Sequence, residues 1–174
     1  GGGILGDKQL KAVIPGGSST FILGADKVDT PLDYESIAAV GSMLGSGGVI
    51  VMNEDTCIVG AILRMSEFYR DESCGKCTPC REGTYWMTEI LERLESGHGK
   101  MKDVDLLMDI CDNISGKSFC PLGDAATSCI TSGIKLFRAE FEYHVTHGHC
   151  MAGAGRTHVE TESTQNASLH AGAL

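Results

Sequence analysis

The chain lacks several features that would place it in a common functional class. It has no patch of lysine and arginine with interleaved aromatic residues, and 14 basic against 23 acidic residues give a formal net charge of -9. We therefore expect no nucleic acid as a partner. No apolar run approaches the roughly 20 residues of a membrane-spanning helix, so we expect no direct membrane insertion. The first residues, Gly1–Asp7, lack the charged start and apolar centre of a secretory signal peptide.

Motifs of hydrolytic enzymes and of phosphate-binding loops are also missing. The carboxylates of Asp33, Glu35, Glu54 and Asp55 have no base or nucleophile placed to work with them, so we assign no catalytic residue. The glycine-rich stretch Gly45–Gly48 lacks a following Lys-Ser/Thr pair and precedes an apolar run that reads as a strand. A phosphate-binding loop would instead open a helix.

Cysteine, by contrast, is abundant, with eight residues in a chain of 174. Without a secretory signal, clustered cysteines favour a metal site over disulfides. Cys74, Cys77 and Cys80 are separated by two residues each, and a remote Cys120 stands directly before Pro121. Three closely spaced thiolates with a distant fourth are the ligand pattern of iron–sulfur proteins. The sequence therefore predicts one iron–sulfur cluster on these four cysteines.

Zinc is the main rival for the same ligands, since four thiolates also suit tetrahedral Zn²⁺. Zinc sites usually take two separated pairs of ligands, whereas the division here is three plus one, which favours iron–sulfur. A disulfide network is a further alternative. Lys76 and Arg81 flank the predicted site, and they either raise the reduction potential of an anionic cluster or are ordinary solvated charges.

The remaining cysteines are interpreted without a metal role. Cys57 and Cys111 are expected on helices as small buried hydrophobic residues. Cys129 is expected near the site but is not needed as a ligand, and Cys150 is expected to be free. Histidines near the carboxyl end have no partners that would fix a ligand geometry. These histidines are His144, His147, His149, His158 and His170.

The pattern of apolar residues predicts an α+β fold. Strands are expected at 10–14, 20–23 and 49–52, and a short helix at 34–40 is expected to be capped by Asp33. Amphipathic periodicity then predicts a bundle of four helices with short connections. These helices are expected at 55–70, 81–95, 103–114 and 124–146, and the second groups Trp86 with Met87, Ile90, Leu91 and Leu94. Cys74, Cys77 and Cys80 are expected on the turn between the first two of these helices, and Cys120 on the loop between the last two. An antiparallel bundle would allow both loops to fall at one end.

Several motifs resemble one known family. Glu72–Gly83 resembles the iron–sulfur signature of the NADH-binding flavoprotein subunit of respiratory complex I, and Phe119–Ala126 resembles the motif that holds its fourth cluster ligand. Lys11–Ser19 and Gly41–Gly48 resemble the ubiquitin-like (β-grasp) domain of the same subunit. The resemblance covers about residues 8–148, and the motifs occur in the same order.

The resemblance implies a function for the intact subunit. It takes a hydride from NADH onto FMN and passes single electrons to a [4Fe–4S] cluster bound by Cys74, Cys77, Cys80 and Cys120. Clusters in neighbouring peripheral-arm subunits carry the electrons toward quinone. The implied location is cytoplasmic, peripheral on the cytoplasmic face of the inner membrane, or on the matrix side in a mitochondrion.

The resemblance also divides the chain. Residues 1–53 are expected to be a truncated β-grasp segment, 54–150 a helical 4Fe–4S-binding domain, and 151–174 a flexible tail. The family's nucleotide and flavin domain is not found in the chain. We therefore expect a fragment of NADH:quinone oxidoreductase that binds neither NADH nor FMN and is not active alone.

Two other functions remain open at this point. The diaphorase subunit of an NAD-reducing hydrogenase or of a formate dehydrogenase shares the cysteine signature, although the residues around Cys120 favour complex I. A zinc-stabilised interaction module without a redox role is an alternative of a different class.

Overall fold

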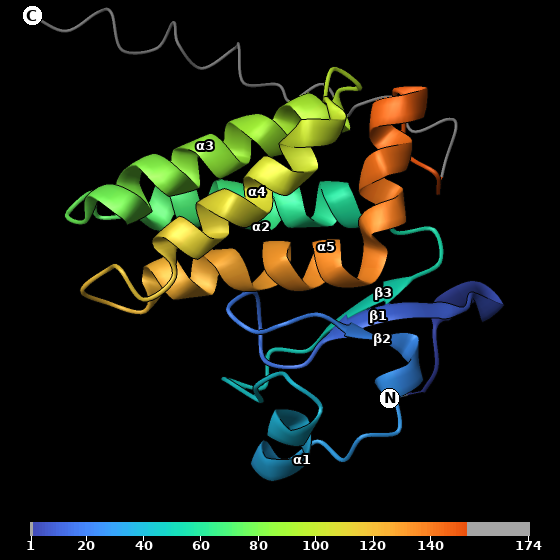
Figure 1. The fold of residues 1–174 in the computed structure, drawn as a ribbon. Coiled ribbons are helices and arrows are strands. Elements are labelled where there is room, and N and C mark those ends of the chain that lie inside the picture. The colour runs from blue at the N-terminus through green and yellow to red at the C-terminus, as the bar shows by residue number, and fades with distance from the viewer. Residues whose placement is uncertain (1, 153–174) are drawn as a thin grey trace, which may run out of the picture.

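The structure is a computed structural model, and it describes residues 2–152. Most of the predicted tail, residues 153–174, lies outside the described residues. A small antiparallel sheet and a larger helical part form the fold (Figure 1), so the predicted α+β class is confirmed. The elements in chain order are β1 (Leu10–Ile14), β2 (Leu23–Gly24), α1 (Tyr34–Ala39), β3 (Ile50–Asn53), α2 (Ile58–Glu72), α3 (Thr78–Glu95), α4 (Met101–Ile114) and α5 (Leu122–His147).

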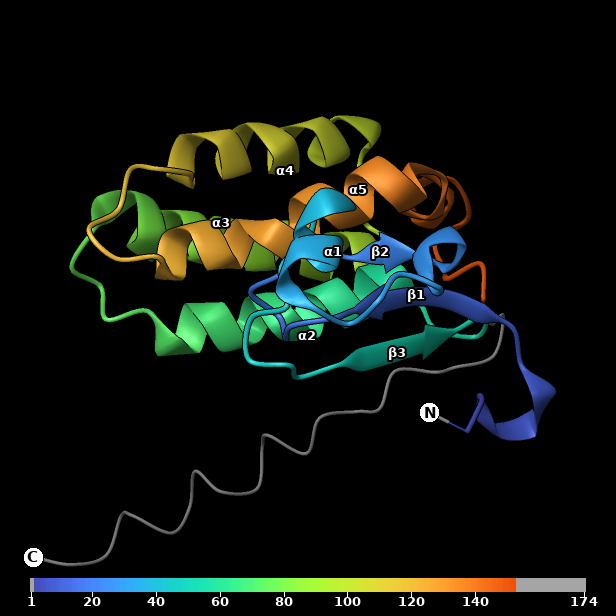
Figure 2. The ribbon, with the colours of Figure 1, turned by 90° about the horizontal axis from the view of Figure 1, so that it is seen from below.

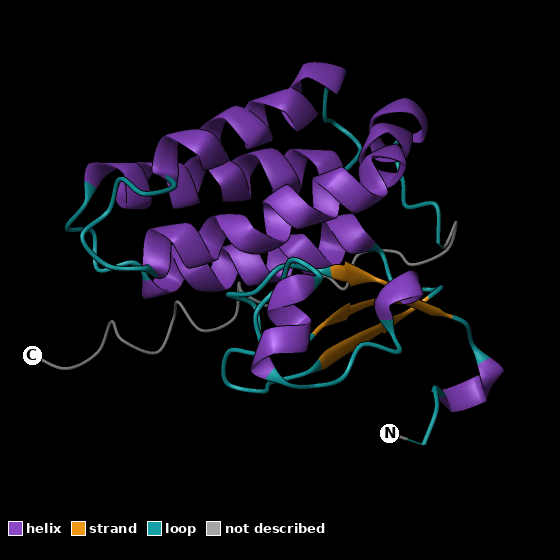
Figure 3. Cartoon of the chain, turned by 60° about the horizontal axis from the view of Figure 1, so that its bottom comes forward, coloured by secondary structure: helices purple, strands orange, loops and turns teal. Residues whose placement is uncertain are grey.

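The sheet has the strand order β2-β1-β3, with antiparallel pairing on both sides of β1. Ala12, Ile14 and Met52 are buried and join the same apolar core as the helices. This alternation of buried and partly exposed residues is what a sheet covered on one face requires. Figures 1 and 3 show that the long helices α2 to α5 lie on one side of the strands, whereas the short helix α1 lies away from them, beyond the sheet. The sheet therefore forms a layer against the long helices.

The strand expected at 20–23 is the least accurate of the predicted elements. Only Leu23 and Gly24 pair with β1. The backbone N–H and the hydroxyl of Thr20 both donate to the Gly17 carbonyl, at 3.0 Å each. These bonds close a turn over residues 17–20, and the backbone before Leu23 is therefore not free to pair.

The four predicted long helices are all present, and each buries one apolar stripe. In α3 the stripe runs through Met87, Leu91 and Leu94, whereas Trp86, which the sequence grouped with it, is 52% exposed. The short helix α1 begins at Tyr34, and the Asp33 side chain accepts the Ser36 backbone N–H at 2.7 Å. The predicted cap is therefore confirmed.

Helix α5 changes direction at Phe137, whose backbone angles (φ −128°, ψ 29°) are not helical. Figure 1 shows the second half of α5 turned away from the first half. This bend carries His144 toward the start of α2, and Glu140 on the same half reaches the Ile58 backbone N–H at 3.3 Å. The bend thus decides which residues meet at the amino-terminal end of α2.

Polar contacts join the sheet to α5. The Ser132 hydroxyl accepts the Ile22 backbone N–H at 2.9 Å, and Lys11 on β1 forms an ion pair with Glu140 at 2.6 Å. The two parts of the described chain therefore share one packed interface as well as one apolar core. No helix within residues 2–152 has the length and apolar character needed to cross a membrane.

Candidate metal centre

Two loops at one end of the helical part carry the predicted cluster ligands. Cys74 and Cys77 lie between α2 and α3, and Cys120 lies between α4 and α5. Figures 1 and 2 place both loops at the same end of the helices in perpendicular views. The antiparallel arrangement that the sequence predicted for these connections is therefore present.

One of the three clustered cysteines, Cys80, lies in a helix and not in the connecting loop. Helix α3 begins at Thr78, so Cys77 is its N-cap residue and Cys80 lies in its first turn. The sequence predicts all three cysteines on the connecting turn, and for Cys80 that prediction is wrong. The reason is Pro79, which is well tolerated in the first turn of a helix because its missing N–H has no partner there.

Direct contacts bring the two loops together. The Phe119 backbone N–H donates to the Cys77 sulfur at 3.4 Å, across 42 residues of chain. The Ser73 hydroxyl lies 3.3 Å from the Cys80 sulfur. Hydrogen bonds to cysteine sulfurs are one of the means by which proteins set the potential of an iron–sulfur cluster. The residue next to Cys120 therefore touches a member of the triplet.

Helix ends give this region a positive electrostatic character. Cys77 caps the amino terminus of α3, and Cys120 directly precedes Pro121, the N-cap residue of α5. Backbone N–H groups at a helix amino terminus have no partners within the helix and carry a partial positive charge. Two such ends stabilise thiolates and an anionic metal cluster.

Arg81 has a local task that the sequence did not reveal. Its guanidinium donates to the Gly75 carbonyl at 2.8 Å and to Glu82, also at 2.8 Å. Gly75 has a φ of +73°, a conformation that side chains other than glycine rarely adopt. Arg81 thus fastens the tight loop between Cys74 and Cys77, in addition to placing a positive charge beside it.

Two other cysteines are buried in the core, which the sequence indicated for Cys111. The Cys111 thiol faces the Met87 sulfur at 3.7 Å, and the Cys129 thiol donates to the Ser18 carbonyl at 3.0 Å. Burial raises the pKa of each of these thiols to about 12. Cys129 therefore lies against the turn after β1 and is held there by a backbone carbonyl.

These pKa shifts predict a clear difference in thiol reactivity. At pH 8 a thiol with a pKa of about 12 is ionised in roughly one molecule in 10⁴. In the cluster-free folded protein, iodoacetamide is expected to label the exposed Cys74 and Cys120 in minutes while Cys111 and Cys129 stay unlabelled. Peptide mass spectrometry after a timed quench measures this, with urea-unfolded protein as the control in which all thiols react. Equal labelling of Cys129 in the folded protein would contradict its burial.

A second group of ligand side chains was missed by the sequence interpretation. Cys57 is the N-cap residue of α2 and not a buried helix residue, and Cys57, His144 and Cys150 gather within 4.8 Å. The expectation that His144 has no metal-ligating neighbours is therefore wrong. Cys57 is 87 residues before His144 in the chain, and the bend at Phe137, which helps to bring them together, has no marker in the sequence.

These observations define a class of protein. It is an α+β domain in which three clustered cysteines and a distant fourth lie near the amino termini of two helices. Comparison with known proteins makes the assignment specific. The family described as NADH-ubiquinone oxidoreductase-F iron-sulfur binding region matches residues 60–144, and this part of the chain belongs to that family. The family binds a 4Fe–4S cluster, so the predicted cofactor is confirmed. The predicted oxidoreductase family is confirmed as well.

Curated relatives carry a consistent name. The chain is 54% identical to the F subunit of NADH-quinone oxidoreductase from Mycobacterium tuberculosis over 149 residues, which are 86% of this chain and 34% of the relative. The same subunit from Streptomyces coelicolor is 53% identical over 86% of this chain and 33% of the relative, and that from Rickettsia akari is 47% identical over 81% and 34%. The chain thus spans about a third of the length of these relatives.

A solved structure with the same fold supports the assignment. A crystal structure of NAD⁺-reducing [NiFe]-hydrogenase in the H₂-reduced state aligns with a TM-score of 0.71 and 26% sequence identity. The alignment covers 79% of this chain and 24% of that chain. The mixed architecture of helices and a small sheet is therefore shared between the two kinds of enzyme.

Proposed function

We propose that Cys74, Cys77, Cys80 and Cys120 bind one [4Fe–4S] cluster and that the chain is the electron-relay portion of an NADH:quinone oxidoreductase. The observation that carries this proposal is the contact between the two cysteine loops, in which the Phe119 N–H donates to the Cys77 sulfur at 3.4 Å. This contact brings the Cys120 loop up against the triplet. The name shared by the curated relatives supports the enzyme class.

When bound, a [4Fe–4S] cluster supplies one-electron oxidation and reduction, because the charge is spread over several irons and sulfurs. The protein holds the cluster and sets its reduction potential. Cys77 and Cys80 receive hydrogen bonds from Phe119 and Ser73, and the amino termini of α3 and α5 oppose negative charge. Arg81, whose charge is paired with Glu82, fixes the loop. The hydrogen bonds and the two helix termini favour the reduced, more negative state and so raise the reduction potential.

The remainder of the reaction is proposed for the intact subunit. We assign the transfer of a hydride from NADH to FMN to the intact subunit, of which this chain spans about a third of the length. Electrons then pass to iron–sulfur subunits of the peripheral arm and on to quinone, at the cytoplasmic face of the inner membrane or the mitochondrial matrix side. The side chain of Phe119, next to Cys120, is 92% exposed. Such an exposed aromatic side chain supports the proposal that a neighbouring subunit binds at this end of the helices.

The finer description of the fold is part of the same proposal. We interpret residues 1–53 as the truncated β-grasp segment of the subunit and the helices α2 to α5 as its four-helix bundle. The boundary at residues 53 and 54 coincides with the end of β3 at Asn53. Helix α2, the first helix of the proposed domain at 54–150, begins at Ile58.

The likeness to the NAD⁺-reducing hydrogenase favours a second candidate, a diaphorase subunit. That likeness rests on 26% identity, whereas the relatives named as subunits of NADH-quinone oxidoreductase are 44 to 54% identical over more than four-fifths of the chain. The higher identity favours the quinone-linked enzyme. Both candidates require the same cluster.

Metal analysis of anaerobically purified protein tests the proposal. We expect iron and acid-labile sulfide in equal amounts, a brown chromophore, and a paramagnetic signal after reduction with dithionite. In the intact subunit within its complex, loss of the cluster is expected to abolish quinone reduction by NADH while NADH still reduces the flavin. Stoichiometric zinc on these cysteines without sulfide would instead support the interaction module.

A further inference from the structure

A separate group of ligand atoms lies at the opposite end of α2 from the cysteine loops. The sulfurs of Cys57 and Cys150 and a ring nitrogen of His144 all lie within 4.8 Å of one another, and this is the only such group among residues 2–152. Helix α2 has 15 residues. At 1.5 Å of rise per residue it places this group about 22 Å from the iron–sulfur end, so the group is a distinct site.

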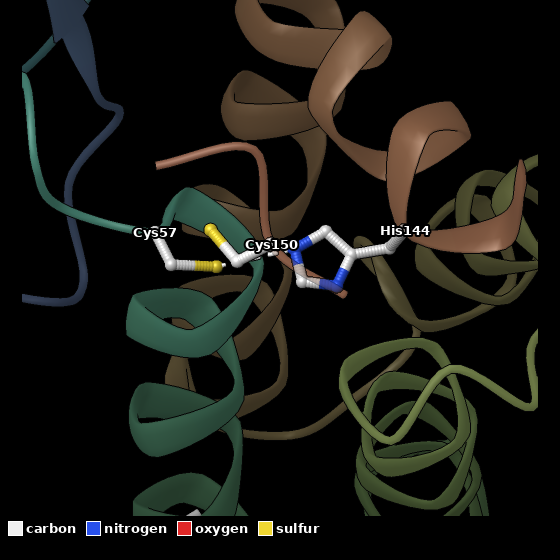
Figure 4. A group of neighbouring side chains, drawn as sticks. All are labelled: Cys57, His144 and Cys150. Carbon is white, nitrogen blue, oxygen red and sulfur yellow. Dashed lines mark hydrogen bonds between the residues drawn. The ribbon is translucent and has the colours of Figure 1, made fainter. Parts of the chain in front are cut away.

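The atoms are placed as ligands of one ion would be. Figure 4 shows the Nε2 atom of His144 directed at the two sulfurs. The distance from Nε2 to the Cys57 sulfur is 3.3 Å. Tetrahedral zinc, with bonds of about 2.3 Å to sulfur and about 2.0 Å to nitrogen, separates these two atoms by about 3.5 Å. An ion therefore fits among the three side chains with small movements.

Each of the two sulfurs accepts a backbone N–H. Gly60 donates to the Cys57 sulfur at 3.3 Å, and Ala152 donates to the Cys150 sulfur at 3.3 Å. Cys57 is also the N-cap residue of α2, where the helix dipole favours negative charge. Donors aimed at both sulfurs favour thiolates, the form in which cysteine binds metal. They oppose the effect of the Glu95 carboxylate, which lies 3.6 Å from the Cys57 sulfur.

His144 supplies the second, independent observation. Its side chain is fully buried, and its Nδ1 atom has no well-formed hydrogen bond within the described residues. The Glu95 carboxylate lies 3.6 Å from Nδ1, and the Leu94 carbonyl is also adjacent. A buried polar atom without a partner is costly. A metal on Nε2 would fix the proton on Nδ1, where these acceptors lie, as in the carboxylate–histidine pairs of many metal sites.

Zinc binding at this site needs a neutral imidazole and two thiolates. An ion therefore has to displace the thiol protons, which leave to solvent as the metal–sulfur bonds form.

We propose that Cys57, His144 and Cys150 bind one Zn²⁺ ion, with Glu95 as the carboxylate that accepts the Nδ1 proton of His144. Two thiolates and one imidazole are a donor set for zinc and not for magnesium or calcium, which take oxygen ligands. The ion ties the segment after α5 to the start of α2 and closes a loop from residue 57 to 150 around the helical part. Its role is to stabilise that part from the end opposite the iron–sulfur site.

The backbone is adapted to this closure at Gly97. This residue has a φ of +76°, and a side chain there would collide with the backbone of Gly148. The absence of a Cβ lets the turn after α5 rest directly on the end of α3. Cys150 follows two residues after Gly148, and the close approach therefore brings its sulfur to Cys57.

The test uses the full chain, purified anaerobically with its iron–sulfur cluster, dialysed against a mild chelator and titrated with zinc chloride. Zinc and iron are measured together. We expect one zinc per chain with the iron content unchanged. Cys57→Ser and Cys150→Ser are each expected to weaken zinc binding by more than about 100-fold, the upper range for loss of an outer-shell partner. Cys129→Ser, which removes a buried thiol elsewhere on α5, is the matched control and should bind zinc normally.

The variants also distinguish this site from the iron–sulfur site. Cys77→Ser should lose iron and keep the second-site zinc, while Cys150→Ser should keep iron and lose zinc. Replacement of zinc by Co²⁺ should give sulfur-to-cobalt charge-transfer bands in the parent and in Cys129→Ser but not in Cys57→Ser. Undiminished zinc binding by both Cys57→Ser and Cys150→Ser overturns the proposal. So does a Cys57–Cys150 disulfide in anaerobic protein that takes up no zinc.

Discussion

Replacing Cys77 by serine is expected to abolish the iron–sulfur cluster. The serine hydroxyl has a far higher pKa than a thiol and is a poor ligand for iron in a sulfide cluster. Cys77 is also the residue through which the two cysteine loops touch, because its sulfur accepts the Phe119 N–H. The change therefore removes one ligand and weakens the closure that positions Cys120. Iron, acid-labile sulfide and the paramagnetic signal of the reduced protein should fall to background.

The matched control for this prediction is Cys57→Ser. It makes the same chemical change at the other end of α2, about 22 Å away by helix rise, and should leave the iron–sulfur signals intact. Circular dichroism of both variants shows whether the helices persist. If Cys77→Ser retains a full cluster, the proposed ligand set is wrong. If Cys57→Ser loses the cluster, the wrong thiols have been chosen.

Local pattern was sufficient to predict most of the fold. The long helices follow from apolar residues at helical spacing, and β1 and β3 follow from short apolar runs next to glycine-rich turns. The errors fall where a local hydrogen bond or a single residue decides the outcome. Thr20 closes a turn in place of a strand, and Pro79 starts α3 earlier than the periodicity of its apolar face indicates.

The two sites differ in how far the sequence reveals them. Three of the proposed cluster ligands lie within a stretch of seven residues, and their spacing alone indicates a metal site. Cys57 and His144 are 87 residues apart, and no spacing rule connects them. Their meeting depends on the bend at Phe137 and on the approach of Gly148 to Gly97. Both are consequences of tertiary packing, and neither has a sequence marker.

A buried ion pair near the start of α2 is expected to make a large contribution to stability. Lys11 on β1 binds the Glu140 carboxylate at 2.6 Å and the Thr56 carbonyl at 2.7 Å. The other carboxylate oxygen of Glu140 accepts the Ile58 N–H at the start of α2. The side chains of Lys11 and Glu140 are only 15% and 9% exposed. One buried pair thus joins the sheet, α2 and α5.

Lys11→Met is expected to lower the free energy of unfolding by about 3–5 kcal/mol, because it leaves the Glu140 carboxylate buried without a cation. Urea unfolding followed by circular dichroism measures the change. Lys8→Met is the matched control: Lys8 pairs with Asp55 at 3.0 Å, but both side chains are more than a third exposed, so the midpoint should hardly move. Adding Glu140→Gln to Lys11→Met should restore much of the loss, since the neutral amide still accepts the Ile58 N–H. Equal effects of Lys11→Met and Lys8→Met would show that the buried pair does not join the sheet to the helices.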